Sequence, residues 1–393
     1  MIDARRWRRR PGLAQLLDAL GAGEGLTRYV GGAVRDALLD LPVSDVDLAT
    51  RLRPEKVVER LQAAGLKAIP TGIEHGTVTA VSAGHPYEVT TLRRDVETFG
   101  RHATVAFTDD WREDAARRDF TINALMADPA SGEVFDYFDG LADLRARHVR
   151  FIGDPFERIA EDHLRILRFF RFHARFGRDE PDEAALEACT ERANDLMALS
   201  RERIADELLK LLSVENPAAA VRIMLERSIL KPVIPEIGRE SWDKLEGLVD
   251  SERSAGLEGD PIRRLAALLP GDPEVAGEVA SRLRLSNKAK KRAKCAADPQ
   301  IAADPRATAY LAGVECTVDR LLLASRPDDA QKIAGWKPPR LGIGGGELIK
   351  RGLPEGPIVS RTLRRIEEKW IEAGFPAGAE FDRIVEQALQ DPR

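Results

Sequence analysis

Two aspartates separated by one residue, Asp45 and Asp47, carry the clearest potential for chemistry in this sequence. On a strand, both carboxylates would project from one face while Val46 packs on the other. Two like charges held this close favour binding of a cation, and Mg²⁺ prefers such oxygen ligands. Mg²⁺ bridges triphosphate oxygens and lowers the pKa of an attacking hydroxyl. The pair alone is weak evidence, because Asp-x-Asp also occurs in solvent-facing turns.

A glycine turn precedes the aspartate pair, within the sequence YVGGAVRDALL at 29–39. Gly31 and Gly32 allow backbone amides to approach a phosphate, and the start of the following helix adds a favourable dipole. Arg35 lies one turn into that helix, where its guanidinium can meet an anion. The alternative is a tight strand-to-helix turn without a ligand. The aspartate pair that follows favours a triphosphate site.

A third carboxylate, Glu88, lies in the strand-like sequence YEVTTL at 87–92. Alternation places Tyr87 and Val89 on the face opposite Glu88. We therefore expect Glu88 to join the two aspartates in catalysis. The alternative is an exposed glutamate on an edge strand.

A polar segment at 93–110 is too long for a tight hairpin, so we expect it to be irregular and mobile. Next, the sequence EDAARRDFTINAL at 113–125 has a helical pattern with Arg117 and Arg118 near its start. Arg118 is the candidate for holding a triphosphate. An arginine pair on a solvated helix face is the alternative.

The sequence EDHLRILRFFRF at 161–172 predicts one amphipathic helix. Asp162, Arg165 and Arg168 share an arc of about 120° on its polar side, with apolar residues opposite. An aspartate accepts from an exocyclic amine and an arginine donates to ring acceptors, which fits cytosine and adenine. Guanine and uracil would leave buried polar groups unpaired. A ladder of salt bridges at i,i+3 spacing is the alternative.

The elements that must position these residues change in type along the chain. Strand-like runs are expected at 28–30, 46–49, 77–81, 87–92 and 133–135. From Pro155 onward the pattern is helical. The chain of 393 residues is 43% hydrophobic, enough for about two to three domains with packed cores. These features predict an α+β protein with an all-α extension.

Although the net charge is −5, two stretches of the sequence are strongly basic. Residues 145–178 hold nine arginines, and residues 282–294 hold seven Lys or Arg and no acid. The second stretch predicts a basic helix with Ser286 as its N-cap. Its candidate contacts to an RNA backbone are Lys288, Lys290, Lys291 and Arg292. A solvated helix face is the alternative.

The location of the protein is predicted from its cysteines and its lack of a long apolar run. Cys189, Cys295 and Cys316 are isolated and odd in number, which fits a reducing compartment and gives no metal motif. No run of eighteen apolar residues occurs, so we expect no membrane association. We predict a cytoplasmic protein, and the Arg-rich start leaves a mitochondrial address as the alternative.

Together these motifs resemble the class II CCA-adding enzyme and bacterial poly(A) polymerase family of nucleotidyltransferases. The resemblance covers residues 28–215, including the sequence RIADEL at 203–208. It implies an α+β fold in four parts, which are a head at 1–143 with a five-stranded mixed sheet, a helical neck at 144–215, a helical body at 216–310 and an RNA-binding helical tail at 311–393.

The resemblance also implies a reaction and its participants. These are addition of C, C and A to the 3′ end of tRNA, with CTP and ATP as substrates, Mg²⁺ as cofactor and the tRNA acceptor arm as partner. No DNA partner is expected. The implied contacts are Gly32 and Arg35 to triphosphate, Asp45 and Asp47 to Mg²⁺, Arg118 to nucleotide, and Asp162, Arg165, Arg168 and Arg171 to the base.

Three alternative functions stay open from the sequence. Poly(A) synthesis uses the same catalytic residues. A nucleotide-sugar glycosyltransferase also uses an Asp-x-Asp metal pair, but it does not account for the glycine turn or for RRDFTINAL. A catalytically silent RNA-binding protein would be expected to have lost Asp45 or Asp47, and both are present.

Overall fold

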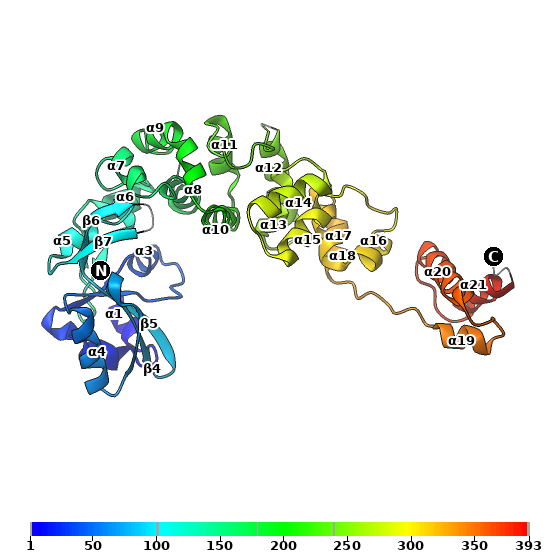
Figure 1. The fold of residues 1–393 in the computed structure, drawn as a ribbon, viewed down its shortest axis with the longest axis horizontal. Coiled ribbons are helices and arrows are strands. Elements are labelled where there is room, and N and C mark those ends of the chain that lie inside the picture. The colour runs from blue at the N-terminus through cyan, green and yellow to red at the C-terminus, as the bar shows by residue number, and fades with distance from the viewer. Residues whose placement is uncertain (1, 100–101, 179, 239, 391–393) are drawn as a thin grey trace. The chain divides into compact units, whose positions relative to one another are not determined.

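The structure is a computed structural model that describes residues 2–99, 102–178, 180–238 and 240–390. It consists of two compact units, Met1–Val233 and Ile234–Arg393, which we describe one at a time (Figure 1). In the described parts of the chain, no helix has the length and apolar character needed to cross a membrane.

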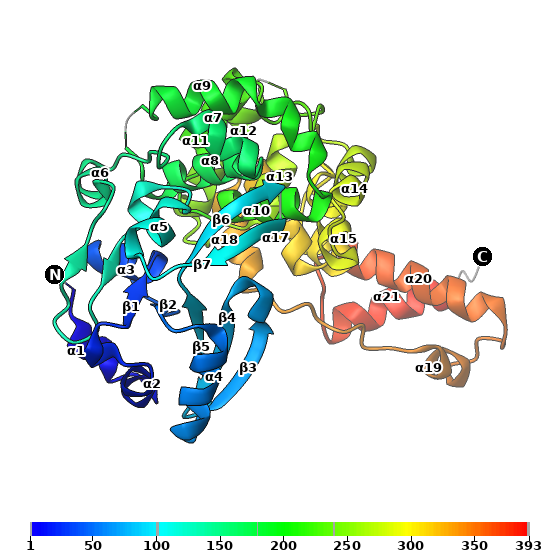
Figure 2. The ribbon, with the colours of Figure 1, turned by 60° about the vertical axis from the view of Figure 1, so that its left-hand side comes forward.

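A mixed sheet with the strand order β3-β4-β5-β2-β1-β8-β9 forms the head of the first unit (Figure 2). Its strands are β1 (Thr27–Val30), β2 (Leu48–Thr50), β3 (Lys67–Gly72), β4 (Thr77–Ser82), β5 (His85–Thr91), β8 (Met126–Ala127) and β9 (Val134–Phe135). The predicted α+β class and mixed sheet are confirmed, and the sheet is wider than the five strands expected. The prediction missed β3, which contains Pro70, and β8, which is too short to show alternation.

The register of the central strands decides which residues become neighbours. Strand β2 pairs in antiparallel fashion with β1 and in parallel with β5, with Leu48 opposite Val89. Strand β5 also pairs with β4, so β5 is an interior strand. Because Leu48 is opposite Val89, the preceding residues Asp47 and Glu88 are also neighbours across the two strands.

The segment expected to be irregular forms a hairpin instead. Its strands are β6 (Arg93–Phe99) and β7 (His102–Phe107), paired in antiparallel fashion in a separate two-stranded sheet. The expectation of an irregular loop at 93–110 was therefore wrong. The polar composition of this segment concealed its strand character.

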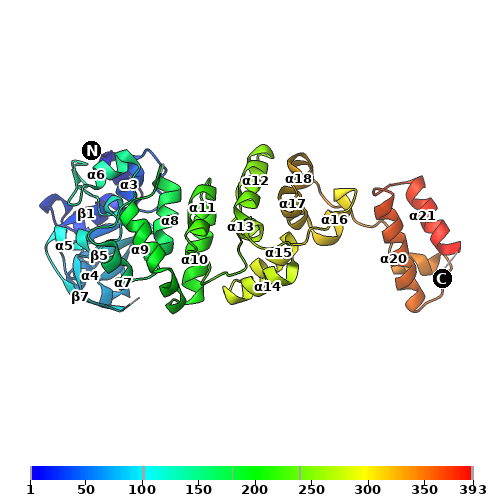
Figure 3. The same cartoon turned by 90° about the horizontal axis from the view of Figure 1, so that it is seen from above.

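Helices make up the rest of the first unit. They are α1 (Ala4–Arg8), α2 (Leu13–Ala19), α3 (Gly32–Leu38), α4 (Pro54–Ala63), α5 (Trp111–Ala116), α6 (Gly140–Ala146), α7 (Pro155–Glu161), α8 (Arg165–Phe176), α9 (Glu183–Glu191), α10 (Arg201–Leu212) and α11 (Ala218–Glu226), with short 3₁₀ turns at Ala22–Glu24, Ile73–His75, Thr121–Asn123 and Ala193–Ala198. Helix α8 packs against α10 and α11 (Figure 3). Its buried phenylalanines meet Phe120 and Phe151, with the Phe120 and Phe151 rings 4.8 Å apart.

The single helix predicted over 161–172 is interrupted. Helix α7 ends at Glu161 and α8 begins at Arg165. Asp162 has extended backbone angles, and its Oδ1 accepts a hydrogen bond from the Leu164 amide at 3.1 Å. Asp162 therefore ends α7, and its side chain bonds the backbone two residues further on, in the turn between α7 and α8, a role that suits aspartate better than a helix interior.

The second unit is helical. Its helices are α12 (Ser241–Ser254), α13 (Pro261–Leu268), α14 (Pro273–Arg282), α15 (Asn287–Ala296), α16 (Pro305–Ala312), α17 (Val314–Leu323), α18 (Pro327–Ala334), α19 (Gly345–Lys350), α20 (Pro357–Glu372) and α21 (Ala379–Gln390). One core joins α12, α13, α16, α17 and α18, and another joins α19, α20 and α21. Helices α17 and α18, which follow residue 310, share the first of these cores with α12 and α13.

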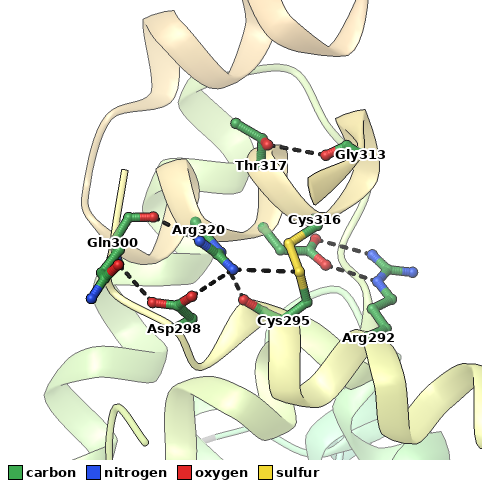
Figure 4. Close-up of a disulfide and its surroundings, with 9 residues drawn as sticks. Arg292, Cys295, Asp298, Gln300, Gly313, Cys316, Thr317 and Arg320 are labelled. Atoms are coloured by element: carbon green, nitrogen blue, oxygen red, sulfur yellow. Dashed lines mark hydrogen bonds and ion pairs between the residues drawn. A yellow bond between two sulfur atoms is a disulfide. The ribbon is translucent and has the colours of Figure 1, made fainter. Parts of the chain in front are cut away.

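Two of the cysteines are joined in the second unit. Cys295 of α15 and Cys316 of α17 form a disulfide with their Cα atoms 5.8 Å apart (Figure 4). Arg320 donates to the Cys295 carbonyl at 2.8 Å beside this bond. The view of all three cysteines as isolated was therefore wrong for this pair, and Cys189 is buried and free. The sequence separation of 21 residues gave no sign that two helices would bring them together.

Candidate nucleotide and metal site

The aspartate pair lies immediately before a strand and not within it. Strand β2 begins at Leu48, although the Val30 amide still donates to the Asp47 carbonyl at 3.1 Å. The predicted alternation holds, because Val46 is 4% exposed while Asp45 and Asp47 are exposed. The expectation that both aspartates lie on a strand was wrong, but both side chains still face away from the core.

Glu88 lies beside the aspartates on an interior strand. Together they line a cavity of about 650 Å³, here called the carboxylate cavity, with Arg10 and His85 also in its wall. Tyr87 and Val89 are buried on the opposite face, as predicted. The alternative of an edge-strand glutamate does not apply, because β5 has a partner on each side.

The electrostatics of the carboxylate cavity favour a cation. Although Asp47 keeps surface exposure, the protein atoms packed around its carboxylate partly desolvate it, and this desolvation and then the charge of Glu88 raise the pKa of Asp47, while Arg118 opposes the shift. Desolvation and the neighbouring carboxylate both disfavour the charged form of Asp47, and a bound cation would stabilise that form. Among the described residues, no three His, Cys, Asp or Glu side chains converge closely enough to hold a metal by themselves. Two carboxylates that share an ion with substrate phosphates fit the donor set that Mg²⁺ uses.

Arg10 supports the loop that carries the aspartates. Its guanidinium donates to the Ser44 carbonyl at 2.7 Å and also to the Val43 carbonyl. The Ser44 hydroxyl in turn donates to Asp45 Oδ2 at 3.0 Å. The sequence gave no signal for this role, because the arginines at 5–10 suggested only a possible targeting segment.

The glycine turn has the strand, turn and helix order that the sequence predicted. Gly31 has a φ of 67° and a ψ of −129°, which only glycine adopts readily. A Cβ at Gly31 would lie 3.0 Å from the Arg118 guanidinium. The turn therefore requires glycine both for its conformation and for the close approach of Arg118.

Arg35 is buried beneath this turn, at 5% exposure. Its guanidinium lies 4.1 Å from the centre of the Phe176 ring and donates to Asn123 Oδ1. Burial lowers the pKa of Arg35, and its ion pair with Asp36 opposes this shift. An arginine in such a setting remains charged and fixed in orientation.

One cavity of about 460 Å³, here called the nucleotide cavity, brings together the predicted nucleotide-binding residues except Arg171. Its lining is Gly31, Gly32, Arg35, Arg118, Asp119, Asn123, Asp162, Arg165, Arg168 and Phe172. Arg171 instead donates to the buried Glu207 at 2.7 Å. Sequence reasoning missed Asp119, Asn123 and Phe172, although all three lie inside the motifs it had selected.

Arg118 follows helix α5 and does not begin a helix as predicted, because α5 ends at Ala116. Its Nη2 atom lies 3.3 Å from the buried Asp114. Burial opposes ionisation of Asp114, but Arg117 and Arg118 outweigh it and lower the pKa of that carboxyl. The buried Nε of Arg118 has no hydrogen-bond partner among the described residues. Arg118 thus keeps hydrogen-bonding capacity for a ligand.

Asp162, Arg165 and Arg168 do not form the salt-bridge ladder at i,i+3 spacing that was the alternative to base recognition. Asp162 pairs with Arg203 of α10 at 2.7 Å. Arg165 pairs with Glu161 and donates to the Arg158 carbonyl at 2.8 Å. These partners come from different elements and orient each side chain separately, so the residues are not simply a solvated helix face.

Arg168 is held by two carboxylates. Its Nε donates to Asp119 at 2.8 Å, and its Nη1 lies 3.6 Å from Glu207. Burial would lower the pKa of Arg168, but Asp119 and Glu207 raise it overall. The Arg168 side chain keeps 30% exposure at the nucleotide cavity.

The basic helix predicted in the second unit is α15. Ser286 is its N-cap, as expected, and accepts from the Ala289 amide at 3.2 Å. Lys288 and Lys291 are exposed and Lys290 is half-buried. Arg292 differs, because it forms ion pairs with Asp260, Glu315 and Asp319 within the protein.

Two described protein domains match parts of this chain. The head domain of poly(A) polymerase matches residues 27–150, and a probable RNA and SrmB-binding site of polymerase A matches residues 180–240. The mitochondrial CCA tRNA nucleotidyltransferase 1 of Mus musculus is 34% identical over 390 residues, covering 93% of this chain and 87% of that protein. The CCA-adding enzyme of Latilactobacillus sakei is 31% identical, covering 92% of this chain and 94% of that protein.

A solved structure is also similar. The Bacillus stearothermophilus CCA-adding enzyme in complex with CTP has a TM-score of 0.73 and 27% sequence identity, covering 96% of this chain and 98% of that chain. The similarity extends over both units described above.

Proposed function

We propose a role for each residue of the two cavities on the premise that this chain belongs to the CCA-adding enzyme family of tRNA nucleotidyltransferases. Its reaction is the addition of C, C and A to the 3′ end of tRNA from CTP and ATP. The terminal 3′-hydroxyl of the RNA attacks the α-phosphate, a phosphodiester bond forms, and pyrophosphate leaves. The observation that carries the assignment of residues is that the nucleotide cavity contains the glycine turn, Arg118 and the neck residues together.

The triphosphate site that we propose is built on the glycine turn. Backbone amides at Gly31 and Gly32 donate to phosphate oxygens, and Arg118 adds a positive charge. Arg35 supports the turn from below, because its guanidinium is already committed to Asp36 and Asn123. Fixed donors of this kind align the α-phosphate for attack without reorganisation.

The reaction depends on a divalent metal ion, and we propose that the ion is Mg²⁺ held by Asp45 and Asp47. When bound there, Mg²⁺ would neutralise phosphate charge and lower the pKa of the 3′-hydroxyl. Glu88 contributes negative charge beside Asp47, which strengthens cation binding. Arg10 holds the loop in place through the Val43 and Ser44 carbonyls.

We propose that the base is recognised by side chains of α8 and by Asp162 in the turn that precedes it. Asp162 accepts from the exocyclic amine of cytosine or adenine, and Arg165 donates to ring acceptors. Arg168 adds a second donor. Arg171 lies outside the cavity lining and supports α8 through Glu207.

The contacts to tRNA and the division into domains are also proposals. Lys288, Lys290 and Lys291 on α15 are exposed or half-exposed and suit the acceptor-arm backbone, whereas Arg292 is engaged within the protein. We propose head, neck, body and tail regions as expected from the sequence, with the body extended through α18 on the evidence of its core. A cytoplasmic location is likewise proposed, and a mitochondrial one is the alternative that the named mouse relative favours.

Replacing a metal-binding aspartate tests the proposed chemistry. Asp45→Ala should lower incorporation of CMP into tRNA that ends before CCA by about a thousandfold or more, because it removes a metal ligand worth several kcal/mol. Thermal stability should not change, since Asp45 is exposed. Asp18→Ala, which removes another exposed aspartate, is the matched control. Unchanged CMP incorporation by the Asp45 variant would exclude the proposed metal site.

Supplying the nucleotides one at a time separates CCA addition from poly(A) synthesis. With CTP alone, the enzyme should extend RNA that ends before CCA, and with ATP alone it should extend only RNA that already ends in CC. A polymerase for poly(A) would ignore CTP. Sequencing the product made with both nucleotides shows how many of the three residues the chain adds.

A further inference from the structure

Asp119 is a buried carboxylate that the proposed reaction does not use directly. It is 7% exposed, beneath the nucleotide cavity, and it accepts hydrogen bonds from the Phe120 amide at 2.9 Å and from Asn123 Nδ2 at 3.0 Å. Arg168 approaches it from α8 with Nε at 2.8 Å and a second bond through Nη2. Both bonds from Arg168 end on Asp119 Oδ2, whereas Oδ1 accepts the bonds from Phe120 and Asn123, so the Nε edge of the guanidinium is held at one carboxylate oxygen.

Asn123 extends these contacts toward the glycine turn. Its side-chain oxygen accepts from Arg35, while its amide group donates to Asp119. Its backbone oxygen lies 3.6 Å from where a Cβ of Gly31 would be. A continuous series of hydrogen bonds therefore runs from Arg168 through Asp119 and Asn123 to Arg35, here called the cavity chain.

Aromatic contacts link the same two helices a second time. Arg35 of α3 lies over the rings of Phe172 and Phe176 of α8, at 5.3 and 4.1 Å from their centres. Phe172 also lies below Arg168, at 5.4 Å. Helix α8 and the glycine turn are thus joined by hydrogen bonds and by ring packing.

The cavity chain keeps its charges at neutral pH. Burial opposes ionisation of Asp119, but Arg168 and the hydrogen bond from Asn123 outweigh it and lower the pKa of that carboxyl. The geometry also shows which N–H donors of Arg168 remain available to a bound base. Nε and Nη2 face Asp119, whereas Nη1 is 3.6 Å from Glu207, too long for a good hydrogen bond.

We propose that Asp119 and Asn123 are positioning residues that fix the orientation of Arg168 relative to the glycine turn, so that base selection depends on the cavity chain. This inference rests on the proposed role of Arg168 in base recognition. With its Nε edge held by Asp119, Arg168 presents Nη1 in one direction, and a base with a misplaced carbonyl or amine is left unpaired. Without the hydrogen bonds to Asp119, the Arg168 guanidinium can rotate and donate to other bases.

Asp119→Asn tests the proposal, because it retains the shape of the side chain but removes its charge. We expect the ratio of kcat/KM for CTP over UTP, and for ATP over GTP, to fall about tenfold, since a charge-assisted bond is lost. The correct nucleotides should show mainly a raised KM. Asp143→Asn is the matched control, because Asp143 is 8% exposed and bonds Thr121 and Arg150 away from the cavity.

A second variant keeps the proposal testable if Asp119→Asn does not fold. Asn123→Ser removes the bridge between Asp119 and Arg35 while the pair of Asp119 and Arg168 remains. It should lower both ratios by a smaller factor than Asp119→Asn. Discrimination equal to wild type in a folded Asp119 or Asn123 variant would overturn the proposal.

Arg168→Ala separates failure of this inference from failure of the proposed function. If Arg168→Ala relaxes base selection while Asp119→Asn does not, only the positioning role is wrong. If Arg168→Ala itself leaves selection intact, the proposed role of Arg168 is wrong and the inference falls with it. The double variant Asp119→Asn with Arg168→Ala should discriminate no worse than Arg168→Ala alone, because both remove one interaction.

Discussion

Both units of the molecule bury arginines among carboxylates, but they use them differently. In the first unit, Arg168 meets Asp119 and Glu207 at the wall of the nucleotide cavity. In the second, Arg292 meets Asp319, which is fully buried, and Asp319 also pairs with Arg263. Glu252 and Arg264 continue the second group, here called the helix cluster, which ties together α12, α13, α15 and α17.

The comparison teaches that ion pairs alone do not separate Arg168, which we propose binds the base, from Arg292, and that the cavity beside Arg168 does. Arg168 and Arg292 both lie in locally basic sequence, and both were predicted to contact a ligand. Arg168 faces an open cavity with 30% exposure, whereas Arg292 has 17% exposure and three carboxylate partners. We therefore expect changes near the cavity to affect activity, and changes in the helix cluster to affect stability.

The largest expected effect is on stability. Arg292→Met should lower the free energy of unfolding by about 3–5 kcal/mol, because it leaves the charge of Asp319 buried with one partner fewer. Urea unfolding followed by circular dichroism measures this loss, and activity per folded molecule should stay close to wild type. A variant of unchanged stability that no longer binds tRNA would reverse the assignment of Arg292.

A substitution at the nucleotide cavity should lower activity and leave stability nearly unchanged. Arg165→Met should reduce kcat/KM for CTP about ten- to hundredfold, because a donor to the base is lost. Stability should change by less than about 1 kcal/mol, since the partner of Arg165, Glu161, remains partly exposed. Steady-state kinetics and urea unfolding on the same preparation measure both quantities. A large stability loss with normal kcat/KM would show that Arg165 belongs with the structural arginines.

The sequence selected candidate site residues from short patterns whose chemistry is local. Gly31 and Arg168 line the nucleotide cavity and Asp45 and Glu88 the carboxylate cavity, and their functional roles remain proposals. The order of strand, glycine turn and helix was also predicted correctly, since it depends on neighbouring residues.

What the sequence could not give depends on contacts between distant segments. The partners Asp119 for Arg168 and Arg203 for Asp162 lie 49 and 41 residues away. Likewise, the disulfide partner of Cys295 lies on α17, two helices further along the chain. The ion-pair partners of Arg292 are Asp260, Glu315 and Asp319. The break at Asp162 was missed because apolar periodicity continues across it, although aspartate is a common cap.

The smallest expected effect concerns Lys288, Lys290 and Lys291 of α15, which lie outside the nucleotide cavity and outside the helix cluster. Replacing Lys288, Lys290 and Lys291 by Gln should raise KM for tRNA about tenfold at low salt and reduce the salt dependence of binding by about two to three counterions. KM for CTP should not change. Lys244 and Lys332, which are exposed on α12 and α18 of the same unit, provide the control when changed to Gln. An equal effect from both sets would mean that general charge, and not α15, attracts the RNA.

The parallel pairing of β2 with β5 makes enzymatic activity a reporter of correct folding. Glu88 is beside Asp47 only because Leu48 is opposite Val89. A slip of one residue would replace Glu88 with Tyr87 or Val89 and turn apolar side chains outward. With the role proposed for Glu88, a chain that folds with the wrong strand register would be inactive as well as unstable, so every active molecule in a preparation would have the correct sheet.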